Sequence, residues 1–545
     1  MSGAPAPWAC PALPARQRSR PATISPTCPM PPTANLRALF ATLVAAGALA
    51  LVPATASALP ESTFQADREL LQSGDATAAA TLDELKGFGV DRIRVTVLWK
   101  RIAPASGSTR RPAGFDGANP ADYPESGWAP YDNLVRMAAA RGIGLNFNVT
   151  APAPRWATAR ASSRFLQDTW KPSAREFGRF VTALGRRYSG SYTPAGEGSP
   201  LPRVRYWSIA NEPNLPQWLA PQSVHGRPYS PSLYRAQADA AYAALGRTGH
   251  GRDTILIPDL APMGSDSTGA SLIIKPMRFI RALYCVDTSY RPLRGGVARA
   301  VGCPSRPSAA AFRRAHPVLF RFTGWSHHPY SQQAAPGVRQ RDPNVVTLAD
   351  LPRLQSAISR VLGAYHVRRR VDLYLTEYGY QTRPPDPNAF ATPARQAAYI
   401  NEADWIAQRN PRVRTMSQYL LSDDPPRTGV PASLRWSSFQ SGLEFPDGTH
   451  KPSYDAYRLP LYLPATGVRR GGRLLVWGFL RPARSGPEQV VTVEFRAAGA
   501  SAWATIAIAR TRNRIVAPRV AFPRSGVVRL AWNGLRSREV AVRVR

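Results

Sequence analysis

Two glutamates occupy matching places in the chain, each directly after a short apolar run. Glu212 follows the run at 204–209 and stands between Asn211 and Pro213, and Glu377 ends the run at 371–376. A single glutamate in such a place is most often a solvated loop residue, but two in register point to a shared task. Two carboxyl groups flanking one bond can divide acid–base and nucleophilic chemistry, as the hydrolysis of a glycosidic bond requires.

The elements that would position these glutamates alternate regularly. Short apolar runs typical of buried strands lie at 62–66, 92–98, 144–149, 204–209, 254–258, 319–325, 371–376 and 415–421. Amphipathic segments typical of helices lie between them, at 76–88, 131–141, 174–188, 233–245, 272–283, 348–365 and 393–409. The expected start signals of the first three helices are Asp75, Pro130 and Ser173.

This alternation predicts an α/β fold with parallel strands, either a closed (β/α)8 TIM barrel or a doubly wound open sheet. No Gly-x-Gly-x-x-Gly follows a strand, which disfavours a dinucleotide-binding open sheet. In a barrel, Glu212 would end the fourth strand and Glu377 the seventh. Because the active sites of such barrels lie at the C-terminal strand ends, we expect a barrel that brings the two glutamates to one mouth.

The pattern changes after residue 463. Short alternating runs at 473–478, 490–495, 502–507, 516–522, 527–532 and 539–544 replace the helical segments. They predict a small C-terminal all-β, sandwich-like domain, which either binds carbohydrate or only caps the barrel. The expected organisation is a signal-peptide region at 1–58, a catalytic (β/α)8 domain at 59–463 and a β-sandwich module at 464–545.

The Asn-Glu-Pro sequence at 211–213 resembles the motif of clan A glycoside hydrolases, the barrel clan that includes families 5 and 39. The sequence around Glu377 is similar to the nucleophile motif of that clan, and the resemblance covers roughly residues 60–460. It implies that Glu212 is the acid/base, that Glu377 is the nucleophile and that Asn211 contacts the sugar. It also implies retention of configuration, with carboxyl groups about 5–5.5 Å apart.

The same resemblance implies roles for residues on other strands. Arg94, on the second strand, would keep Glu377 ionised, although it is one arginine among very many. His328 and Tyr330 resemble the clan's His-x-Tyr, in which the tyrosine hydroxyl binds the nucleophile and the histidine contacts sugar or the acid/base. His327 is a further candidate. A metal site at this histidine pair is the rival interpretation, but adjacent residues of a strand point to opposite faces.

Aromatic residues near the expected strand ends are candidates for stacking on sugar rings, with core packing as the alternative. They are Trp99, Trp156, Trp207 and Trp325, of which we select Trp99 and Trp156 as substrate-binding candidates. The tryptophan that commonly ends the eighth strand in the clan is not evident here. Tyr419 or Trp436 could take its place.

The chain is strongly basic, with 70 lysines and arginines against 35 acidic residues and a formal net charge of +35. Nearly all of the positive charge is arginine, scattered along the whole chain. Two explanations stay open: the codon usage of a GC-rich genome, or attraction to an anionic surface such as cell wall or acidic glycan. A nucleic-acid partner is not predicted, because such proteins usually gather their charge in a patch.

The amino terminus has the layout of a signal peptide. Arg37 is followed by an apolar run to residue 53, and a small-x-small site lies at 56–58. Met30 is an alternative start. We expect a secreted protein, with cell-wall association or an uncleaved anchor as further readings. No later stretch is apolar enough for stable membrane insertion.

Two cysteines follow the predicted cleavage site, Cys285 and Cys303, whereas Cys10 and Cys28 precede it. In an exported chain this pair predicts one disulfide, with two free thiols as the alternative. Metal binding by the pair is disfavoured, because no histidine or further cysteine shares a ligand spacing with it.

These observations predict a secreted, monomeric retaining glycoside hydrolase that acts on O-glycosidic bonds of a poly- or oligosaccharide. Neither a cofactor nor a metal is expected. The alternatives are a cell-wall glucan transglycosylase with the same residues, a non-catalytic carbohydrate-binding protein on the same barrel, and a protein that binds surfaces through charge alone.

Overall fold

The structure is a computed structural model that describes residues 59–545. The predicted signal peptide and the alternative start at Met30 lie outside the described residues. Within 59–545, no helix is both long enough and apolar enough to cross a membrane.

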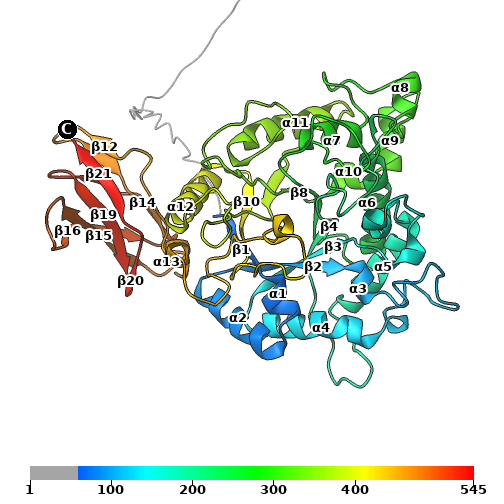
Figure 1. Ribbon diagram of the computed structural model, residues 1–545, viewed down its shortest axis with the longest axis horizontal. Helices are drawn as coiled ribbons and strands as arrows, with labels where there is room; N and C mark the ends of the chain where they lie inside the picture. The colour runs from blue at the N-terminus through cyan, green and yellow to red at the C-terminus, as the bar shows by residue number, and fades with distance from the viewer. Residues whose placement is uncertain (1–58) are drawn as a thin grey trace, which may run out of the picture. The chain divides into compact units, whose positions relative to one another are not determined.

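Eight parallel strands close into a barrel (Figure 1). Each strand pairs with the next, and the last pairs with the first. The closed (β/α)8 TIM barrel that the alternation predicted is therefore confirmed, and the open-sheet alternative is excluded. The strands are β1 (Glu61–Gln65), β2 (Arg92–Leu98), β3 (Gly144–Thr150), β4 (Tyr206–Ile209), β7 (Thr254–Leu260), β8 (Gly324–His327), β9 (Asp372–Leu375) and β10 (Val413–Tyr419).

Helices lie between these strands, and every expected helical segment contains one. The longer helices are α2 (Asp75–Gly87), α4 (Glu125–Ala140), α5 (Ala174–Arg187), α6 (Ser230–Arg247), α7 (Pro276–Leu283), α11 (Leu351–Gly363) and α12 (Pro393–Arg409). The shorter helices are α1 (Asp67–Leu71), α3 (Trp99–Ile102), α8 (Gly295–Arg299), α9 (Ala309–Ala315), α10 (Val318–Arg321) and α13 (Pro452–Arg458). Short 3-10 helices are η1 (Pro120–Asp122), η2 (Arg155–Ala157), η3 (Arg164–Thr169), η4 (Leu348–Asp350) and η5 (Ala432–Leu434). A small hairpin, β5 (Ser223–Val224) and β6 (Arg227–Pro228), follows β4.

Three local expectations were wrong or only partly right. Pro130 does not start the second helix, because α4 begins at Glu125 and contains Pro130. Asp75 is the first helical residue of α2, and Gly74 is its cap. The apolar run at 319–325 is not one strand, because α10 takes its first part and β8 its end. A fully buried apolar run has no periodicity that distinguishes helix from strand. Ser173 does cap α5, since its hydroxyl accepts a hydrogen bond from the Glu176 amide.

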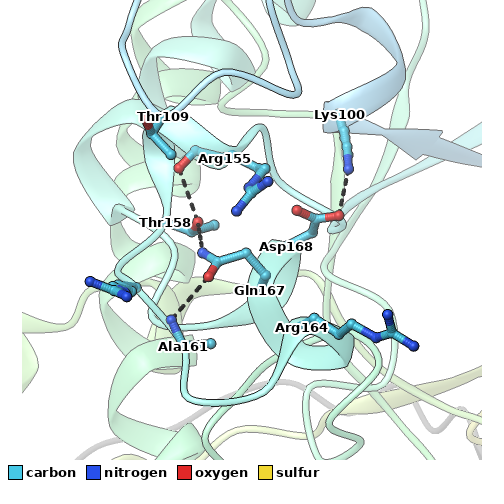
Figure 2. Close-up of a pocket in the computed structure, with 9 residues that line it drawn as sticks. Lys100, Thr109, Arg155, Thr158, Ala161, Arg164, Gln167 and Asp168 are labelled. Atoms are coloured by element: carbon cyan, nitrogen blue, oxygen red, sulfur yellow. Dashed lines mark hydrogen bonds and ion pairs between the residues drawn. The ribbon is translucent and has the colours of Figure 1, made fainter.

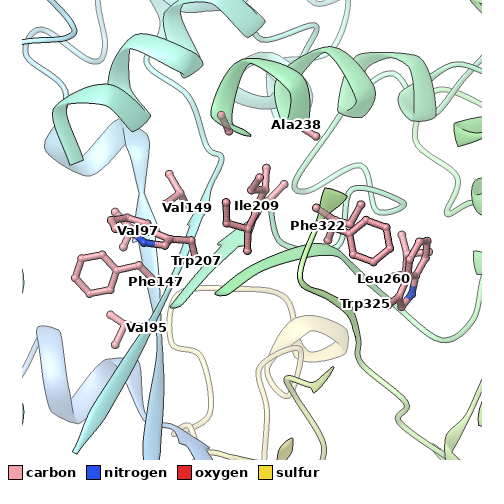
Figure 3. Close-up of a cluster of buried hydrophobic side chains, with 14 of the residues drawn as sticks. Val95, Val97, Phe147, Val149, Trp207, Ile209, Ala238, Leu260, Phe322 and Trp325 are labelled. Atoms are coloured by element: carbon pink, nitrogen blue, oxygen red, sulfur yellow. The ribbon is translucent and has the colours of Figure 1, made fainter. Parts of the chain in front are cut away.

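Side chains alternate along β2 between the outer face of the barrel wall and its inner face. Ile93, Val95 and Val97 are buried against the surrounding helices, whereas Arg92 and Arg94 belong to the barrel interior. Figure 3 shows part of the outer layer, in which Val95 and Val97 lie beside the apolar residues of β3 and β4. Burial of this layer supplies the hydrophobic stabilisation of the barrel wall.

The barrel interior contains polar and aromatic side chains. The Arg92 guanidinium lies 3.4 Å from the centroid of the Tyr206 ring and forms an ion pair with Glu61. A β-carbon at Gly324 would lie 2.1 Å from the Tyr374 ring, so this glycine leaves the space that the tyrosine fills. The charges of Arg92 and Glu61 can lie inside the barrel because each is the partner of the other.

The C-terminal all-β domain is also confirmed. One sheet contains β12 (Gly467–Val468), β21 (Val540–Val544), β19 (Gly526–Trp532), β15 (Gln489–Ala497), β16 (Ala504–Thr511) and β20 (Leu535–Arg536). The smaller sheets contain β11 (Leu461–Tyr462), β14 (Trp477–Phe479) and β17 (Ile515–Val516), and β13 (Arg473–Leu475) with β18 (Arg519–Ala521). This domain has a hydrophobic cluster separate from that of the barrel.

Cys285 and Cys303 form a disulfide, as predicted. The bridge lies in the long excursion between β7 and β8, just after α7. Arg235 of α6 donates hydrogen bonds to the carbonyl of Leu283 and to that of Gly302, on both sides of the bridge. The excursion is thereby tied to the helical layer of the barrel.

Candidate active site

The structure brings Glu212 and Glu377 together at the C-terminal end of the barrel. Glu212 follows β4 and Glu377 follows β9. One carboxylate oxygen of each, together with one ring nitrogen of His328, lie within 4.8 Å of one another. The spacing is short enough for both carboxyl groups to reach the same glycosidic bond.

The backbone after β4 holds Glu212 in an unusual conformation. Ala210 and Glu212 have φ angles of +64° and +36°, in the region that favours glycine. Three hydrogen bonds compensate: the amide of Ala210 donates to the Val149 carbonyl, that of Asn211 to the Thr150 hydroxyl, and that of Glu212 to the carbonyl of a β7 residue, Asp259. Strain of this kind concentrates at functional sites, where surrounding contacts maintain it.

Glu377 is buried and held by two donors. Its Oε1 accepts a hydrogen bond from Arg94 Nη1 at 2.6 Å, and its Oε2 accepts one from the Tyr330 hydroxyl at 3.0 Å. Both contacts favour the ionised carboxylate. The predicted relation of Arg94 and Tyr330 to Glu377 is thus present in the geometry.

Arg94 is the centre of a buried network at the barrel mouth. Besides Glu377, its guanidinium donates to Gln65 Oε1 at 2.5 Å, to Asn211 Oδ1 at 2.6 Å and to Asp259 Oδ2 at 3.0 Å. One side chain therefore links β1, β2, β7 and the segments that follow β4 and β9. This fixes the direction of Asn211, which lines the same cleft as Glu212.

Asp259 is a site residue that the sequence analysis missed. Its carboxylate accepts hydrogen bonds from Asn148 Nδ2 at 2.9 Å and from the Thr376 hydroxyl at 2.7 Å, in addition to that from Arg94. It has a φ of +52°. The signal was available, because Asp259 closes the apolar run of β7 just as the two glutamates follow theirs.

His328 lies between the two glutamates. Its Nδ1 is 2.9 Å from Glu212 Oε1 and 3.4 Å from Glu377 Oε2. His327 points elsewhere, with its Nε2 at 2.9 Å from the carbonyl of Val346. The prediction that His327 supports the substrate is corrected accordingly, and the two histidines do not form a joint metal site.

Charge and burial set the protonation of these groups. Burial raises the pKa of Glu377, and the positive charges of His328 and Arg94 only partly offset this. Burial opposes the charged form of His328, but the negative charge of Glu377 and the contact with Glu212 prevail and raise its pKa. Burial also opposes ionisation of Asp259, but Arg94 lowers its pKa. Burial lowers the pKa of His327 to about 4, so it is neutral near pH 7.

The glutamates lie in a cleft of about 490 Å³. Its size suits a small-molecule or sugar subsite, for which pockets of about 300–1,000 Å³ are typical. Aromatic walls come from Trp218, Tyr419 and Phe439. Tyr419 was expected as a substitute for the missing tryptophan, whereas Trp218 and Phe439 were not predicted and come from loops without regular periodicity. Trp436 is not among the lining residues.

The two tryptophans selected as sugar-binding candidates do not line this cleft. Trp99 is 1% exposed and stacks on Phe180 of α5 at 5.8 Å. Trp156 packs edge-on against Trp99, and its Nε1 donates to the Pro104 carbonyl. Both belong to the packing outside the barrel wall, so their assignment to the substrate is corrected. Core packing, the alternative interpretation, also holds for Trp207 and Trp325, which are buried.

Glu212, His328 and Glu377 are also spaced so that they could hold a metal ion. The Arg94 guanidinium, 2.6 Å from Glu377 Oε1, would repel a divalent cation there. The same arrangement suits two carboxyl groups of which one exchanges a proton with a neutral substrate and the other forms a bond to it.

No protein-family model and no curated protein matches the chain. Similar solved structures include a family 1 β-glucosidase from Thermotoga maritima, 13% identical, with a TM-score of 0.41 and coverage of 74% of this chain and 96% of that chain. A virulence factor from Agrobacterium tumefaciens is 16% identical, with a TM-score of 0.41 and coverage of 73% and 95%. A glycoside hydrolase is 9% identical, with a TM-score of 0.42 and coverage of 89% and 93%. The assignment of the site depends on its own geometry.

Proposed function

We propose that the protein is a secreted retaining glycoside hydrolase that cleaves an O-glycosidic bond of a poly- or oligosaccharide by double displacement. The observation that carries this proposal is the pair Glu212 and Glu377, whose oxygens lie within 4.8 Å at the C-terminal end of the barrel. Retaining enzymes have carboxyl groups about 5–5.5 Å apart, whereas inverting enzymes need about 6.5–9.5 Å to admit a water molecule.

In the first step a Glu377 oxygen forms a bond to the anomeric carbon while the bond from that carbon to the leaving oxygen breaks. Glu212 gives its proton to the leaving oxygen. The donors on Glu377, Arg94 and Tyr330, orient its carboxylate for attack. In the second step Glu212 removes a proton from water, whose oxygen displaces Glu377 from the anomeric carbon.

His328 has a positioning role in this scheme. Its Nδ1 faces Glu212 Oε1 and Glu377 Oε2, so one N–H can be shared between the two carboxyl groups. Asn211, oriented by Arg94, is placed to contact a sugar hydroxyl beside the bond that breaks.

The test uses aryl glycosides and two alanine variants. Glu212→Ala is expected to lose about 10²–10⁴-fold in kcat on substrates with poor leaving groups. With azide it should recover turnover and release a glycosyl azide of retained configuration. Glu377→Ala with azide should release the inverted azide. Proton NMR of the first product of the unaltered enzyme reads the stereochemistry directly.

Glu488→Ala is the matched control, because this exposed glutamate of the C-terminal domain pairs only with Arg510. It should leave kcat and KM as they are. A fully active Glu377→Ala variant, or inversion by the unaltered enzyme, would overturn the proposal.

Export is the second part of the proposal and is supported by the signal-peptide layout at the amino terminus. Expression in a host that secretes proteins should release a chain that begins near residue 59. Mass spectrometry of the intact product measures this, and a product that retains residues 36–53 would contradict cleavage.

A further inference from the structure

A second pocket, larger than the catalytic cleft, lies at the same end of the barrel. Its volume is about 720 Å³. Its walls come from the loops that follow β2 and β3 (Figure 2). We define this basic pocket by the residues that line it, Lys100, Thr109, Arg155, Thr158, Arg160, Ala161, Arg164, Gln167 and Asp168.

The pocket carries a concentrated positive charge. Lys100 is paired with Asp168 at 2.5 Å. Arg155, Arg160 and Arg164 form no ion pair with any residue among 59–545, and all three are exposed. Three unpaired guanidinium groups around one cavity favour an anionic ligand, because each presents a planar fork of donors that fits a carboxylate or sulfate.

The loop that carries these arginines is held in place by its own hydrogen bonds. Gln167 donates from Nε2 to the Thr158 hydroxyl at 3.1 Å and accepts at Oε1 from the Ala161 amide at 3.0 Å (Figure 2). The Lys100–Asp168 pair fastens the end of the loop to the segment after β2. A ligand would therefore meet a preformed site rather than have to order one.

An exposed aromatic ring adjoins the charge. Phe165 is 83% exposed, the largest exposure among the large hydrophobic residues of the described chain. The Arg164 guanidinium lies 5.0 Å from the centroid of its ring. An exposed ring beside a guanidinium offers an apolar face for a sugar ring and a charge for a substituent of that sugar.

The basic pocket and the catalytic cleft adjoin along two segments. Leu98 lines the cleft and Lys100 lines the pocket, two residues further along the chain. On the opposite wall, the Thr169 hydroxyl donates to the carbonyl of Pro216, and the neighbours Asp168 and Gln217 line the pocket and the cleft respectively. One extended ligand could therefore occupy both.

We infer that the basic pocket binds an acidic sugar residue, carboxylated or sulfated, of a polysaccharide whose neutral residue occupies the catalytic cleft. The cleavage part of this inference rests on the proposed function, whereas binding to the pocket does not. The charges of the cleft favour this ligand over nucleic acid. Asp67 and Asp424 also line the cleft and would repel a chain that carries a phosphate at every unit.

Calorimetric titration with a hyaluronan tetrasaccharide, in which carboxylated and neutral sugar residues alternate, tests the inference, and its fully methyl-esterified form is the neutral control of equal size. A sulfated disaccharide tests the second anion, and a short DNA oligonucleotide tests the nucleic-acid alternative. The titrations use the full chain with Glu212→Gln and Glu377→Gln, so that no turnover is needed. The free acid should bind more tightly than the ester, and its affinity should fall as salt is raised.

Arg160→Gln with Arg164→Gln should weaken binding of the free acid by about tenfold or more, the effect of losing charge-assisted hydrogen bonds. Phe165→Ala should weaken binding of acid and ester alike. The matched control is Arg519→Gln with Arg524→Gln, which removes two exposed arginines from the C-terminal domain and should leave affinity unchanged. Thermal melting of each variant checks that it is folded.

Equal affinity for acid and ester would overturn the inference, as would equal losses in the control variant. Tight DNA binding that depends on Arg160 and Arg164 would reassign the pocket to nucleic acid. Intact pocket binding in a protein that hydrolyses no glycoside would contradict the proposed function alone, and hydrolysis without pocket binding would contradict this inference alone.

Discussion

At the scale of single residues, Arg94 and Asp259 determine how the two glutamates differ. Arg94 touches Glu377 but not Glu212, so only one of the two carboxyl groups receives its positive charge. Asp259 in turn keeps Arg94 charged and aligned although both are buried. An arginine without such a partner would be costly to bury. The asymmetry between the proposed acid and the proposed nucleophile comes from this pair.

We predict that activity declines on the acid side at a higher pH than an ordinary glutamate would give. Glu377 must be ionised to attack, and burial raises its pKa. As the pH falls through this raised value the nucleophile becomes protonated and activity is lost. The pH dependence of kcat/KM on an aryl glycoside measures the acid limb. A limb at or below the ordinary glutamate value would contradict the assignment of Glu377.

Two substitutions of Arg94 should separate its charge from its geometry. Arg94→Met removes a charge that lowers the pKa of Glu377, so the acid limb should move to still higher pH. Arg94→Lys keeps the charge and should move the limb less, while kcat falls because lysine lacks the fork that reaches all four acceptors. If the acid limb lies at the same pH in both variants, Arg94 acts on Glu377 through geometry alone.

Asp259→Asn tests the buried pair through stability. It should lower the free energy of unfolding by about 3 kcal/mol, the low end for breaking a buried pair, since Glu377 still faces Arg94. Glu539→Gln is the control, because its pair with Arg496 is exposed and should contribute less than about 1 kcal/mol. Urea denaturation measures both. Equal effects of the two substitutions would count against the role of Asp259.

At the scale of elements, the strand ends carry the proposed catalytic pair, and the loops after them form the walls of the cleft. Residues with positive φ follow or close β4, β7 and β10 at Ala210, Glu212, Asp259 and Leu420. Each lies at or just after the C-terminal end of its strand, where the chain leaves the barrel wall. Such backbone needs support from neighbouring strands, and the hydrogen bonds from the Ala210, Glu212 and Leu420 amides supply it.

The disulfide should contribute to stability through the excursion between β7 and β8. Cys285→Ser with Cys303→Ser opens a loop of 18 residues and is expected to lower the free energy of unfolding by about 3 kcal/mol. Neither cysteine lines the cleft, so kcat should not change. Denaturation with and without reductant measures the effect. If the reductant lowers the free energy of unfolding of the unaltered protein but not that of the double variant, the stabilisation comes from the disulfide.

At the scale of the whole molecule, the buried Arg481 is one of the residues through which the C-terminal domain contacts the barrel. Arg481 donates to Asp404 of α12 at 2.5 Å, to the Ser62 hydroxyl of β1 at 2.7 Å and to the Tyr457 carbonyl of α13 at 2.7 Å. Gly89 accommodates this segment, because a β-carbon there would lie 2.2 Å from the Arg481 carbonyl oxygen. The contact favours the capping role of the domain.

Arg481→Met should lower the free energy of unfolding by about 3–5 kcal/mol, because it leaves Asp404 buried without its partner. Adding Asp404→Leu should restore much of the loss, since replacing both members of a buried pair is often neutral. Arg510→Met, at an exposed pair, is the control and should cost less than about 1 kcal/mol. Chemical denaturation of the unaltered protein and the three variants measures these changes. No recovery of stability in the double variant would contradict this account.

The sequence by itself determined the features that local patterns encode. The alternation of apolar runs and amphipathic segments predicted the barrel, the two motifs predicted Glu212 and Glu377 at its mouth, and the cysteine pair predicted the bridge. Each of these features is encoded either by residues close together in the chain or by the periodicity of apolar residues. Strand counting then related them correctly, because parallel strands of a closed barrel must end at the same face.

Tertiary structure alone decided which side chains meet. Asp259 belongs to the site because β7 brings it against Arg94 from another strand. Its place at the end of an apolar run marks it as a candidate but does not reveal that contact. Trp99 and His327, which were predicted in the site, do not belong to it because their side chains point outward from the barrel wall. The basic pocket was equally hidden, since Arg160 and Arg164 are two among 70 basic residues until the fold closes their loop beside the cleft. The direction of a side chain depends on contacts between distant segments, and periodicity does not record them.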